Sequence, residues 1–147
     1  MKLTFRQANN SDAEALRAIL ESQNLPTESV GKAITDFYIA VDEQQIVGVA
    51  GFEYYGEDVL LRSVAIKSSF QHNGLGSQLV DWMVQLARTK GISRIVLLTE
   101  TAERFFAKKG FAVIERAEIT NIPMKRSSQF GGGCCSSAAC MQMDLSK

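Results

Sequence analysis

The sequence predicts a mixed α/β domain in which most strands of the central sheet run antiparallel. Three apolar segments between Phe37 and Ile66 are joined by short polar turns, and connections of about two to five residues join antiparallel neighbours. The third segment leads through a glycine turn into an amphipathic helix, and another apolar segment, 94–99, follows that helix. A strand reached through a helical crossover runs parallel to the strand before it, so we expect a mixed sheet.

Length and composition are those of an ordinary globular protein. The chain has 147 residues, of which 46% are hydrophobic and 22% are charged, values that fit one domain over residues 1–147. The formal net charge is zero, which argues against binding nucleic acid or an anionic membrane through bulk charge. No apolar run approaches the roughly 20 residues of a membrane span, and no signal peptide is evident. We therefore expect a cytoplasmic location with reduced cysteines.

The first part of the chain predicts one strand and two helices. Residues 3–7 alternate between apolar and polar side chains, as a half-buried strand does. Ser11-Asp12-Ala13-Glu14 has the capping-box pattern, so a helix should begin there and end near Gln23. After the break at Pro26, the apolar spacing predicts a second, shorter helix over 27–34.

The middle of the chain predicts three strands and the longest helix. The strands are expected over 37–41, 46–53 and 59–66. The helix follows Gln71-His72-Asn73-Gly74-Leu75-Gly76 and ends at Gly91. Its apolar stripe consists of Leu75, Leu79, Met83 and Leu86.

The last part predicts three strands, a short helix and a glycine-rich loop. The strands are expected over 94–99, 111–119 and 137–145. Thr101 should cap a helix that reaches Lys109. In total, about seven strands and about four helices are expected.

The glycine turn before the longest helix is a candidate phosphate-binding site. Gly74 and Gly76 let the backbone turn sharply and approach a bulky anion, which the unpaired N–H groups of the helix start would bind. No Gly-Lys-Ser/Thr follows, which excludes a P-loop, and Leu79 stands where a dinucleotide fingerprint has its third glycine. A tight strand-to-helix turn without a ligand is the alternative.

The combination of Leu61-Arg62-Ser63-Val64-Ala65-Ile66, a short spacer and Gln-x-x-Gly-x-Gly resembles the acetyl-CoA site of the GNAT N-acetyltransferase superfamily. The expected order of strands and helices also resembles that superfamily. The resemblance implies the GNAT fold, a mixed and mostly antiparallel sheet of about seven strands flanked by about four helices. It also implies an N-acetyltransferase that uses acetyl-CoA as the acetyl donor and no metal.

Several shorter phrases narrow the resemblance. They include Gly51-Phe52-Glu53, Leu97-Leu98-Thr99-Glu100-Thr101-Ala102 and the tail from Cys134 to Met141. Together they are similar to arsenic-resistance N-acetyltransferases and, more distantly, to N-acetylglutamate synthases. This implies a small amino-acid-like acceptor, with an arsenic-containing amino acid among the candidates.

The resemblance also implies which residues bind acetyl-CoA. The backbone of Val64 and Ile66 would pair with the pantetheine arm as an added strand does. His72 is expected to contribute a backbone N–H and not to catalyse. Phe106 stands where many family members have a tyrosine acid, so a tyrosine-type mechanism is not expected. The residues expected to contact acetyl-CoA are Val64, Ala65, Ile66, Gln71, His72, Asn73, Gly74, Leu75, Gly76, Ser77 and Phe106.

Acetyl transfer requires a neutral amine held beside the thioester. An α-amine with a pKa near 8 is about a tenth neutral at pH 7, so positioning can supply most of the catalysis for an amino acid. Glu53 is the candidate general base, acting through water, and a solvated strand-end glutamate is the alternative.

Arg62 is an arginine in an apolar strand, where its charge requires an anionic partner. A substrate carboxylate is one candidate partner, and an internal ion pair with Glu53 or Glu100 is the other. Arg126 is a weaker candidate for binding a carboxylate. Ser63 and Thr99 are candidates for polar contacts with the acceptor.

The three cysteines, Cys134, Cys135 and Cys140, lie near the C-terminal end of the chain. Their spacing is not a recognised zinc pattern, so reduced structural cysteines are expected and a metalloid site is the alternative. Two further functions remain open: a non-catalytic acyl-CoA-fold protein that binds a metalloid, and a protein N-acetyltransferase. A homodimer is also possible on the resemblance, because GNAT enzymes often form one.

Overall fold

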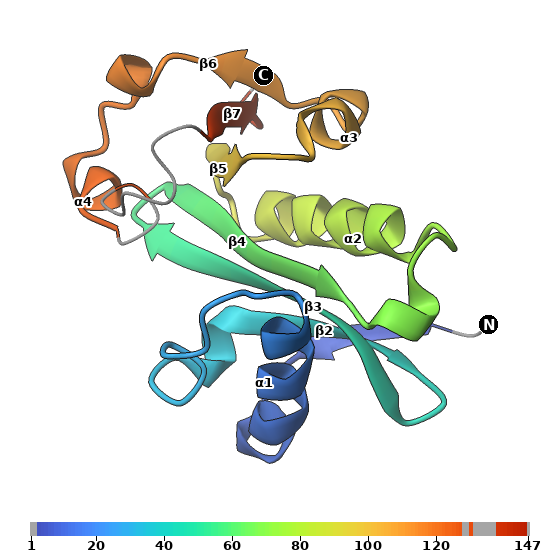
Figure 1. Cartoon of the computed structure of the whole chain (residues 1–147). Coiled ribbons are helices and arrows are strands. Elements are labelled where there is room, and N and C mark those ends of the chain that lie inside the picture. The colour runs from blue at the N-terminus through green and yellow to red at the C-terminus, as the bar shows by residue number, and fades with distance from the viewer. Residues whose placement is uncertain (1–2, 128–129, 131–137, 147) are drawn as a thin grey trace. The chain divides into compact units, whose positions relative to one another are not determined.

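The computed structural model describes residues 3–127, 130 and 138–146 (Figure 1). Within these residues, seven strands form a sheet in the order β1-β2-β3-β4-β5-β7-β6. The pairings β1–β2, β2–β3, β5–β7 and β6–β7 are antiparallel, and β4–β5 is parallel. The mixed, mostly antiparallel sheet is therefore confirmed. The strands are β1 (Leu3–Gln7), β2 (Phe37–Asp42), β3 (Gln45–Tyr55), β4 (Asp58–Ile66), β5 (Arg94–Thr99), β6 (Ala112–Ile114) and β7 (Ala139–Asp144).

Four α-helices occur in the described residues: α1 (Ala13–Ser22), α2 (Leu75–Thr89), α3 (Glu103–Lys108) and α4 (Ile122–Lys125). Gly91 has a φ of +75°, which is the left-handed conformation expected just after the end of α2. The number of helices agrees with the expectation, but one of the four lies elsewhere in the chain.

The segment 27–34 does not form the expected second helix. Its backbone bonds are local turns, including Val30 N–H to the Thr27 carbonyl at 3.1 Å and Ala33 N–H to the Ser29 carbonyl at 2.9 Å. Val30 is fully buried, so the apolar spacing reflects a loop packed on the core. The fourth helix is α4, in a segment expected to be loop, where Asn121 caps the start by accepting from Met124 N–H at 3.1 Å.

Neither expected helix cap is formed by the residue that the sequence indicates. Asn9, not Ser11, accepts from the backbone at the start of the turn before α1, and Asp12 accepts from Asn9 N–H. Ala102, not Thr101, precedes α3. The strand expected over 111–119 is shorter, because a 3₁₀ turn at Arg116–Glu118 follows β6.

The chain folds into two compact units. Unit 1 contains Met1–Phe52 and Ser63–Met83, and unit 2 contains Glu53–Arg62 and Val84–Lys147. In unit 1, Ile39 of β2 packs in the buried cluster that includes Leu16 and Leu20 of α1. Tyr38 precedes Ile39 on β2, and its ring centroid lies 5.8 Å from that of Trp82 on α2. Neighbouring side chains of a strand point to opposite faces, so α1 and the first part of α2 cover opposite faces here.

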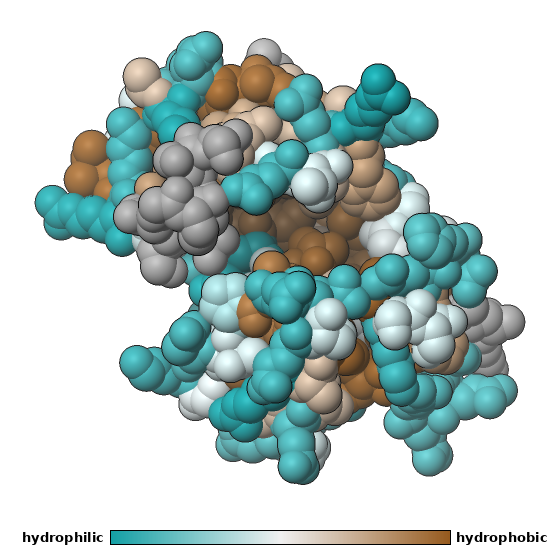
Figure 2. Space-filling view, in the orientation of Figure 1, coloured by the Kyte–Doolittle hydropathy of each residue, from teal (hydrophilic) through white to brown (hydrophobic). Residues whose placement is uncertain are grey.

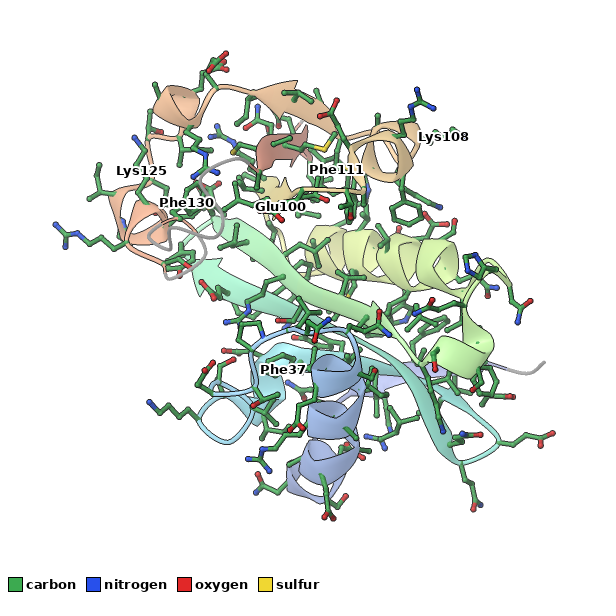
Figure 3. All side chains as sticks on the ribbon, in the orientation of Figure 1. Phe37, Glu100, Lys108, Phe111, Lys125 and Phe130 are labelled. Atoms are coloured by element: carbon green, nitrogen blue, oxygen red, sulfur yellow. The ribbon has the colours of Figure 1, made fainter. Side chains whose placement is uncertain are left out.

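The outer surface of α1 is largely hydrophilic, as expected for a helix with one buried face (Figure 2). In unit 2, residues Asp58–Leu61 of β4 pair with Arg94–Leu97 of β5. The rings of Phe106 and Phe111 pack edge to face, with centroids 5.6 Å apart. Phe111, labelled in Figure 3, lies near α3. A second buried cluster, which lies in unit 2, consists of Leu60, Val96, Ile119, Met124 and Cys140.

A buried carboxylate joins β1 to the start of α1 in unit 1. Asp12 is 5% exposed. Arg6 donates from Nη1 to Asp12 Oδ2 at 2.8 Å and from Nη2 to Oδ1 at 3.0 Å. The hydrogen bonds from Arg6 lower the pKa of Asp12, and those same bonds raise the pKa of Arg6. A two-point ion pair of this kind is among the stronger charged contacts.

We expect Asp12→Asn to lower the free energy of unfolding by about 2 kcal/mol at neutral pH, because a charge-assisted hydrogen bond to a buried group is lost. The depressed pKa means that this stability is present above the ordinary pKa of 3.8 and is lost as the pH falls through the native value. Urea unfolding followed by the fluorescence of Trp82, the one tryptophan of the chain, measures both effects. Glu14→Gln, at an exposed acid on α1, is the control. Equal losses in the two variants would contradict the prediction.

Candidate functional site

The expected glycine turn is present between β4 and α2 in unit 1. A 3₁₀ turn at Ser68–Phe70 follows β4, and α2 begins at Leu75. Gly74 has a φ of +75° and His72 a φ of +69°, so the chain turns sharply before the helix. A Cβ at Gly76 would lie 3.7 Å from Ile66 Cγ1, an ordinary contact distance. Gly74 is thus needed for its backbone conformation, whereas Gly76 leaves the start of the helix bare.

The first turn of α2 is suited to an anion. This 15-residue helix has no acidic residue in its first turn. Its first N–H groups have no partner within the helix, and the positive end of the helix dipole lies there. The geometry at Gln71-His72-Asn73-Gly74-Leu75-Gly76-Ser77 therefore fits the phosphate-binding role expected for it.

Ser63 marks an irregularity in the middle of β4. Its φ is +55°, which is rare for a residue with a side chain and is typical of a bulge. The parallel pairing with β5 involves only Asp58–Leu61, so the residues from Arg62 to Ile66 take no part in it. Val64 and Ile66 are half-buried, and Ala65 is buried.

The Gln71 side chain holds the end of β4. Its Nε2 donates to the Ile66 carbonyl at 3.0 Å, and Gln23 Nε2 donates to the same oxygen at 3.4 Å. The Gln71 side-chain amide therefore links the loop to the strand, and the Gln71 backbone N–H donates to the Ser68 carbonyl at 3.4 Å.

In unit 2, Glu53 lies at the centre of a hydrogen-bond network that joins three segments. Its Oε1 accepts from Tyr55 Oη at 2.5 Å and from Ser127 Oγ at 2.6 Å, and its Oε2 accepts from Arg62 Nη1 at 2.7 Å. The side chains of Arg62 and Glu53 are 10% and 20% exposed. Glu53 is therefore not a solvated strand-end glutamate, and the expected internal ion pair of Arg62 forms with Glu53.

Sequence reasoning missed Tyr55 and Ser127. Tyr55 is two residues after Glu53 on β3, and side chains at this spacing share one face of a strand, so the pattern could have indicated it. Ser127 is 74 residues away from Glu53 in sequence, and no local pattern connects the two. Asn121 positions this late segment, since its Nδ2 donates to the Tyr55 carbonyl at 2.9 Å and to Asp58 Oδ2 at 3.1 Å.

The other expected site residues in unit 2 have different surroundings. Thr99 Oγ1 accepts from Ala102 N–H at 3.0 Å, which organises the start of α3. Phe106 is 7% exposed and packs against Phe105 and Phe111. Arg126 is exposed after the last turn of α4.

Cys140 is a buried apolar thiol. It is 3% exposed within the second buried cluster, and burial raises the pKa of its thiol. Cys134 and Cys135 lie outside the described residues. Among the residues that the structure describes, no three His, Cys, Asp or Glu side chains are grouped so that they could hold a metal ion. None of the described helices is long and apolar enough to cross a membrane.

Tyr55 remains a hydrogen-bond donor over a wide pH range. Burial and, secondly, its bond to Glu53 raise the pKa of Tyr55 from 10.0 to about 12. The stability that this phenol contributes is complete below about pH 10 and is lost as the pH rises towards about 12. We expect wild-type protein to lose free energy of unfolding more steeply than Tyr55→Phe in this window.

Urea unfolding at successive pH values, followed by circular dichroism, checks this expectation. Tyr54→Phe is the matched control, because Tyr54 directly precedes Tyr55 in the chain and its ring lies under the Lys90 ammonium group. If the free energy of unfolding falls with pH equally in wild type and in Tyr55→Phe, the network does not hold the phenol in its protonated form.

Comparison with known proteins agrees with this geometry. The acetyltransferase (GNAT) domain family matches residues 33–113, more than half of the chain. An amino-acid acetyltransferase from Mycobacterium tuberculosis is 28% identical over 127 residues, which span 78% of this chain and 71% of the relative. An uncharacterized N-acetyltransferase from Chlorobaculum tepidum is 26% identical over 119 residues, 76% of each chain.

Two solved structures share the fold. N-acetylglutamate synthase from Neisseria gonorrhoeae, complexed with coenzyme A and N-acetyl-glutamate, matches all of this chain with a TM-score of 0.85 and 21% identity. The present chain spans 36% of that longer chain. A Mycobacterium tuberculosis protein in complex with CoA matches 97% of this chain and 99% of its own with a TM-score of 0.81 and 22% identity. From the family match, together with the sheet and the glycine turn, it follows that this chain belongs to the GNAT acetyltransferase family and is an N-acetyltransferase with acetyl-CoA as donor.

Proposed function

We propose that this enzyme transfers an acetyl group directly from acetyl-CoA to the amine of a small amino-acid-like acceptor. The observation that carries the acceptor class is the Arg62 guanidinium, 10% exposed and held by Glu53. A guanidinium carries five N–H donors in a planar fork, so beside its bond to Glu53 it would offer donors to an acceptor carboxylate. The amino-acid acetyltransferase from Mycobacterium tuberculosis among the relatives supports the same class.

The proposed donor site lies in unit 1. The backbone from Val64 to Ile66 would pair with the pantetheine arm, because this half of β4 takes no part in the parallel pairing with β5. The N–H groups of the loop 71–77 would bind the diphosphate, where Gly76 presents no side chain. Phe106 remains a proposed contact, although it packs in the aromatic group of α3.

The proposed chemistry is attack of a neutral α-amine on the thioester carbonyl, with release of the CoA thiol. Positioning by Arg62 supplies much of the catalysis, because a useful fraction of an α-amine is neutral at pH 7. Glu53 is the proposed base, acting through water. Three donors already bind its two oxygens, and a carboxylate has about four acceptor positions, so a water that relays the proton would share the carboxylate with these donors. In the described arrangement Glu53 also orients Arg62.

The acceptor is also proposed to contact Ser63, Thr99 and Arg126. Of these, Arg126 is exposed and precedes Ser127, the hydroxyl that donates to Glu53. An arsenic-containing amino acid is a narrower proposal for the acceptor, and it would use the same carboxylate contact. The metalloid-binding alternative is disfavoured because one of its three thiols, Cys140, is buried among apolar side chains.

The test is thiol release from acetyl-CoA by purified protein with glutamate, methionine, an amino-acid-like organoarsenical and a peptide N-terminus as acceptors. Turnover with amino acids supports the proposal, and turnover with the peptide alone would replace it with protein acetylation. Turnover with the organoarsenical in strong preference to the other amino acids supports the narrower proposal.

For the preferred acceptor, we expect Arg62→Ala to raise KM roughly 10- to 100-fold, because a charge-assisted contact is lost. The matching α-amide, which lacks the carboxylate, should have the same KM in both proteins. Arg62→Lys keeps the charge and should fall between wild type and Arg62→Ala. Arg126→Ala is the matched arginine control, and a larger effect there than at Arg62 would move the carboxylate contact to α4.

Glu53→Gln separates the two roles of this residue. If Glu53 is the base, kcat falls roughly 10²- to 10⁴-fold and the acidic limb of the pH–rate profile disappears. If Glu53 only orients Arg62, the change is in the KM of carboxylate-bearing acceptors and the pH profile is retained. Circular dichroism and CoA binding by calorimetry confirm that each variant is folded.

A further inference from the structure

The ion pair between Glu53 and Arg62 in unit 2 is made through one oxygen of the carboxylate. Glu53 Oε2 accepts from Arg62 Nη1 at 2.7 Å. The other oxygen, Oε1, accepts from Tyr55 Oη at 2.5 Å and from Ser127 Oγ at 2.6 Å. Arginine and a carboxylate frequently pair at two points, because the fork of the guanidinium matches the two oxygens. The two hydroxyls therefore occupy the oxygen that a two-point pair would need.

The ion pair between Arg6 and Asp12 in unit 1 has the two-point geometry. Arg6 Nη1 donates to Asp12 Oδ2 at 2.8 Å, and Nη2 donates to Oδ1 at 3.0 Å. The backbone N–H of Asn9 also donates to Oδ2, at 2.8 Å. Among the residues that the structure describes, the partners of Asp12 are thus an arginine and a backbone amide, and the arginine binds both oxygens.

Ser127 approaches Glu53 from a segment that is anchored independently. Asn121 Nδ2 donates to the Tyr55 carbonyl at 2.9 Å, and Asn121 Oδ1 accepts from Met124 N–H at the start of α4. Met124 is fully buried, and its carbonyl accepts from Ser127 N–H at 3.0 Å. Ser127 is itself 7% exposed. Its hydroxyl is therefore a fixed donor to Glu53 and not a surface group that turns freely.

We propose that Tyr55 and Ser127 are positioning residues for the carboxylate of the acceptor. Neither hydroxyl touches the acceptor. By binding Glu53 Oε1, the two hydroxyls limit Glu53 to one contact with Arg62, so that Glu53 and the acceptor can share the guanidinium. This inference rests on the proposed function, in which Arg62 binds the acceptor's carboxylate.

Without the hydroxyls, Glu53 competes with the acceptor. A carboxylate that is 20% exposed needs donors for both oxygens. The terminal torsion of a glutamate is broad, so the carboxylate group turns at little cost and binds Arg62 with Oε1 as well as Oε2. The acceptor's carboxylate must then displace one contact of a two-point pair before it binds.

We expect Tyr55→Phe and Ser127→Ala each to raise the KM of the preferred amino-acid acceptor roughly threefold, because one hydroxyl remains on Oε1. The double variant leaves none and should raise this KM roughly 20- to 50-fold, more than the product of the single effects. The KM of the matching α-amide, which lacks the carboxylate, and the KM of acetyl-CoA should be unchanged in each variant. Thiol release measures all of these values.

Ser146→Ala is the matched serine control. The hydroxyl of Ser146 donates to Asp144 Oδ1 at the same distance of 2.6 Å, but it belongs to an exposed residue after β7. Its removal should leave every KM unchanged. Equal increases for the amino acid and its α-amide in the Tyr55 and Ser127 variants would show a general disturbance of the site and would overturn the proposal.

The geometry can also be tested without turnover. A crystal structure of Tyr55→Phe/Ser127→Ala should show both oxygens of Glu53 on the Arg62 guanidinium, as both oxygens of Asp12 bind Arg6 in unit 1. If Glu53 keeps its single contact with Arg62 and Oε1 binds water instead, the proposal is wrong.

Arg62→Ala separates this proposal from the function on which it rests. If Arg62→Ala keeps the wild-type KM for the acceptor, Arg62 does not bind the carboxylate, and the proposed acceptor contact is wrong. If Arg62→Ala raises this KM and Tyr55→Phe/Ser127→Ala does not, the acceptor contact stands and the role of the two hydroxyls is wrong.

Discussion

The carboxylate of Glu53 is the interaction on which the arrangement of unit 2 depends. A carboxylate that is 20% exposed must be compensated by donors, and its donors come from β3, β4 and the end of α4. The bond to Arg62 allows a guanidinium to lie within an apolar strand. The bond to Ser127 holds the residue that follows Arg126 at the end of α4. Removing the carboxylate would leave Arg62 as a buried charge without this partner, which costs more than the pair contributes.

The same network limits the chemistry that Glu53 can perform. A base must present a lone pair to the proton that it removes, and here three of the roughly four acceptor positions of the carboxylate are occupied by Tyr55, Arg62 and Ser127. Burial and the bond to Glu53 raise the pKa of Tyr55 to about 12, so its phenol stays protonated and continues to donate near neutral pH. The arrangement favours orientation of Arg62 in the resting state. An acceptor carboxylate that engages Arg62 would weaken one of these bonds and release an oxygen for proton transfer.

The sequence predicted the sheet and its main helices because their signals are local. Short polar turns and apolar alternation define β2, β3 and β4, and Gly91 marks the end of α2. The expectation for 27–34 is wrong because Val30 is buried from a turn and Ile34 from the start of a 3₁₀ turn, which produces the apolar spacing of a helix without its continuous series of hydrogen bonds. Arg62 could be identified as requiring an anion. Its network could not, because Ser127 approaches only through the tertiary fold.

The glycines show the same limit at finer scale. Gly74 is required by its positive φ, whereas neither conformation nor space requires Gly76. A sequence shows the same residue type in both places and does not distinguish the reasons. Nothing within the described fold forbids a side chain at Gly76, and a ligand that approaches the start of α2 would account for a glycine there. This favours the phosphate-binding turn that we propose over a tight turn without a ligand, the two alternatives that the Gly-x-Gly pattern left open.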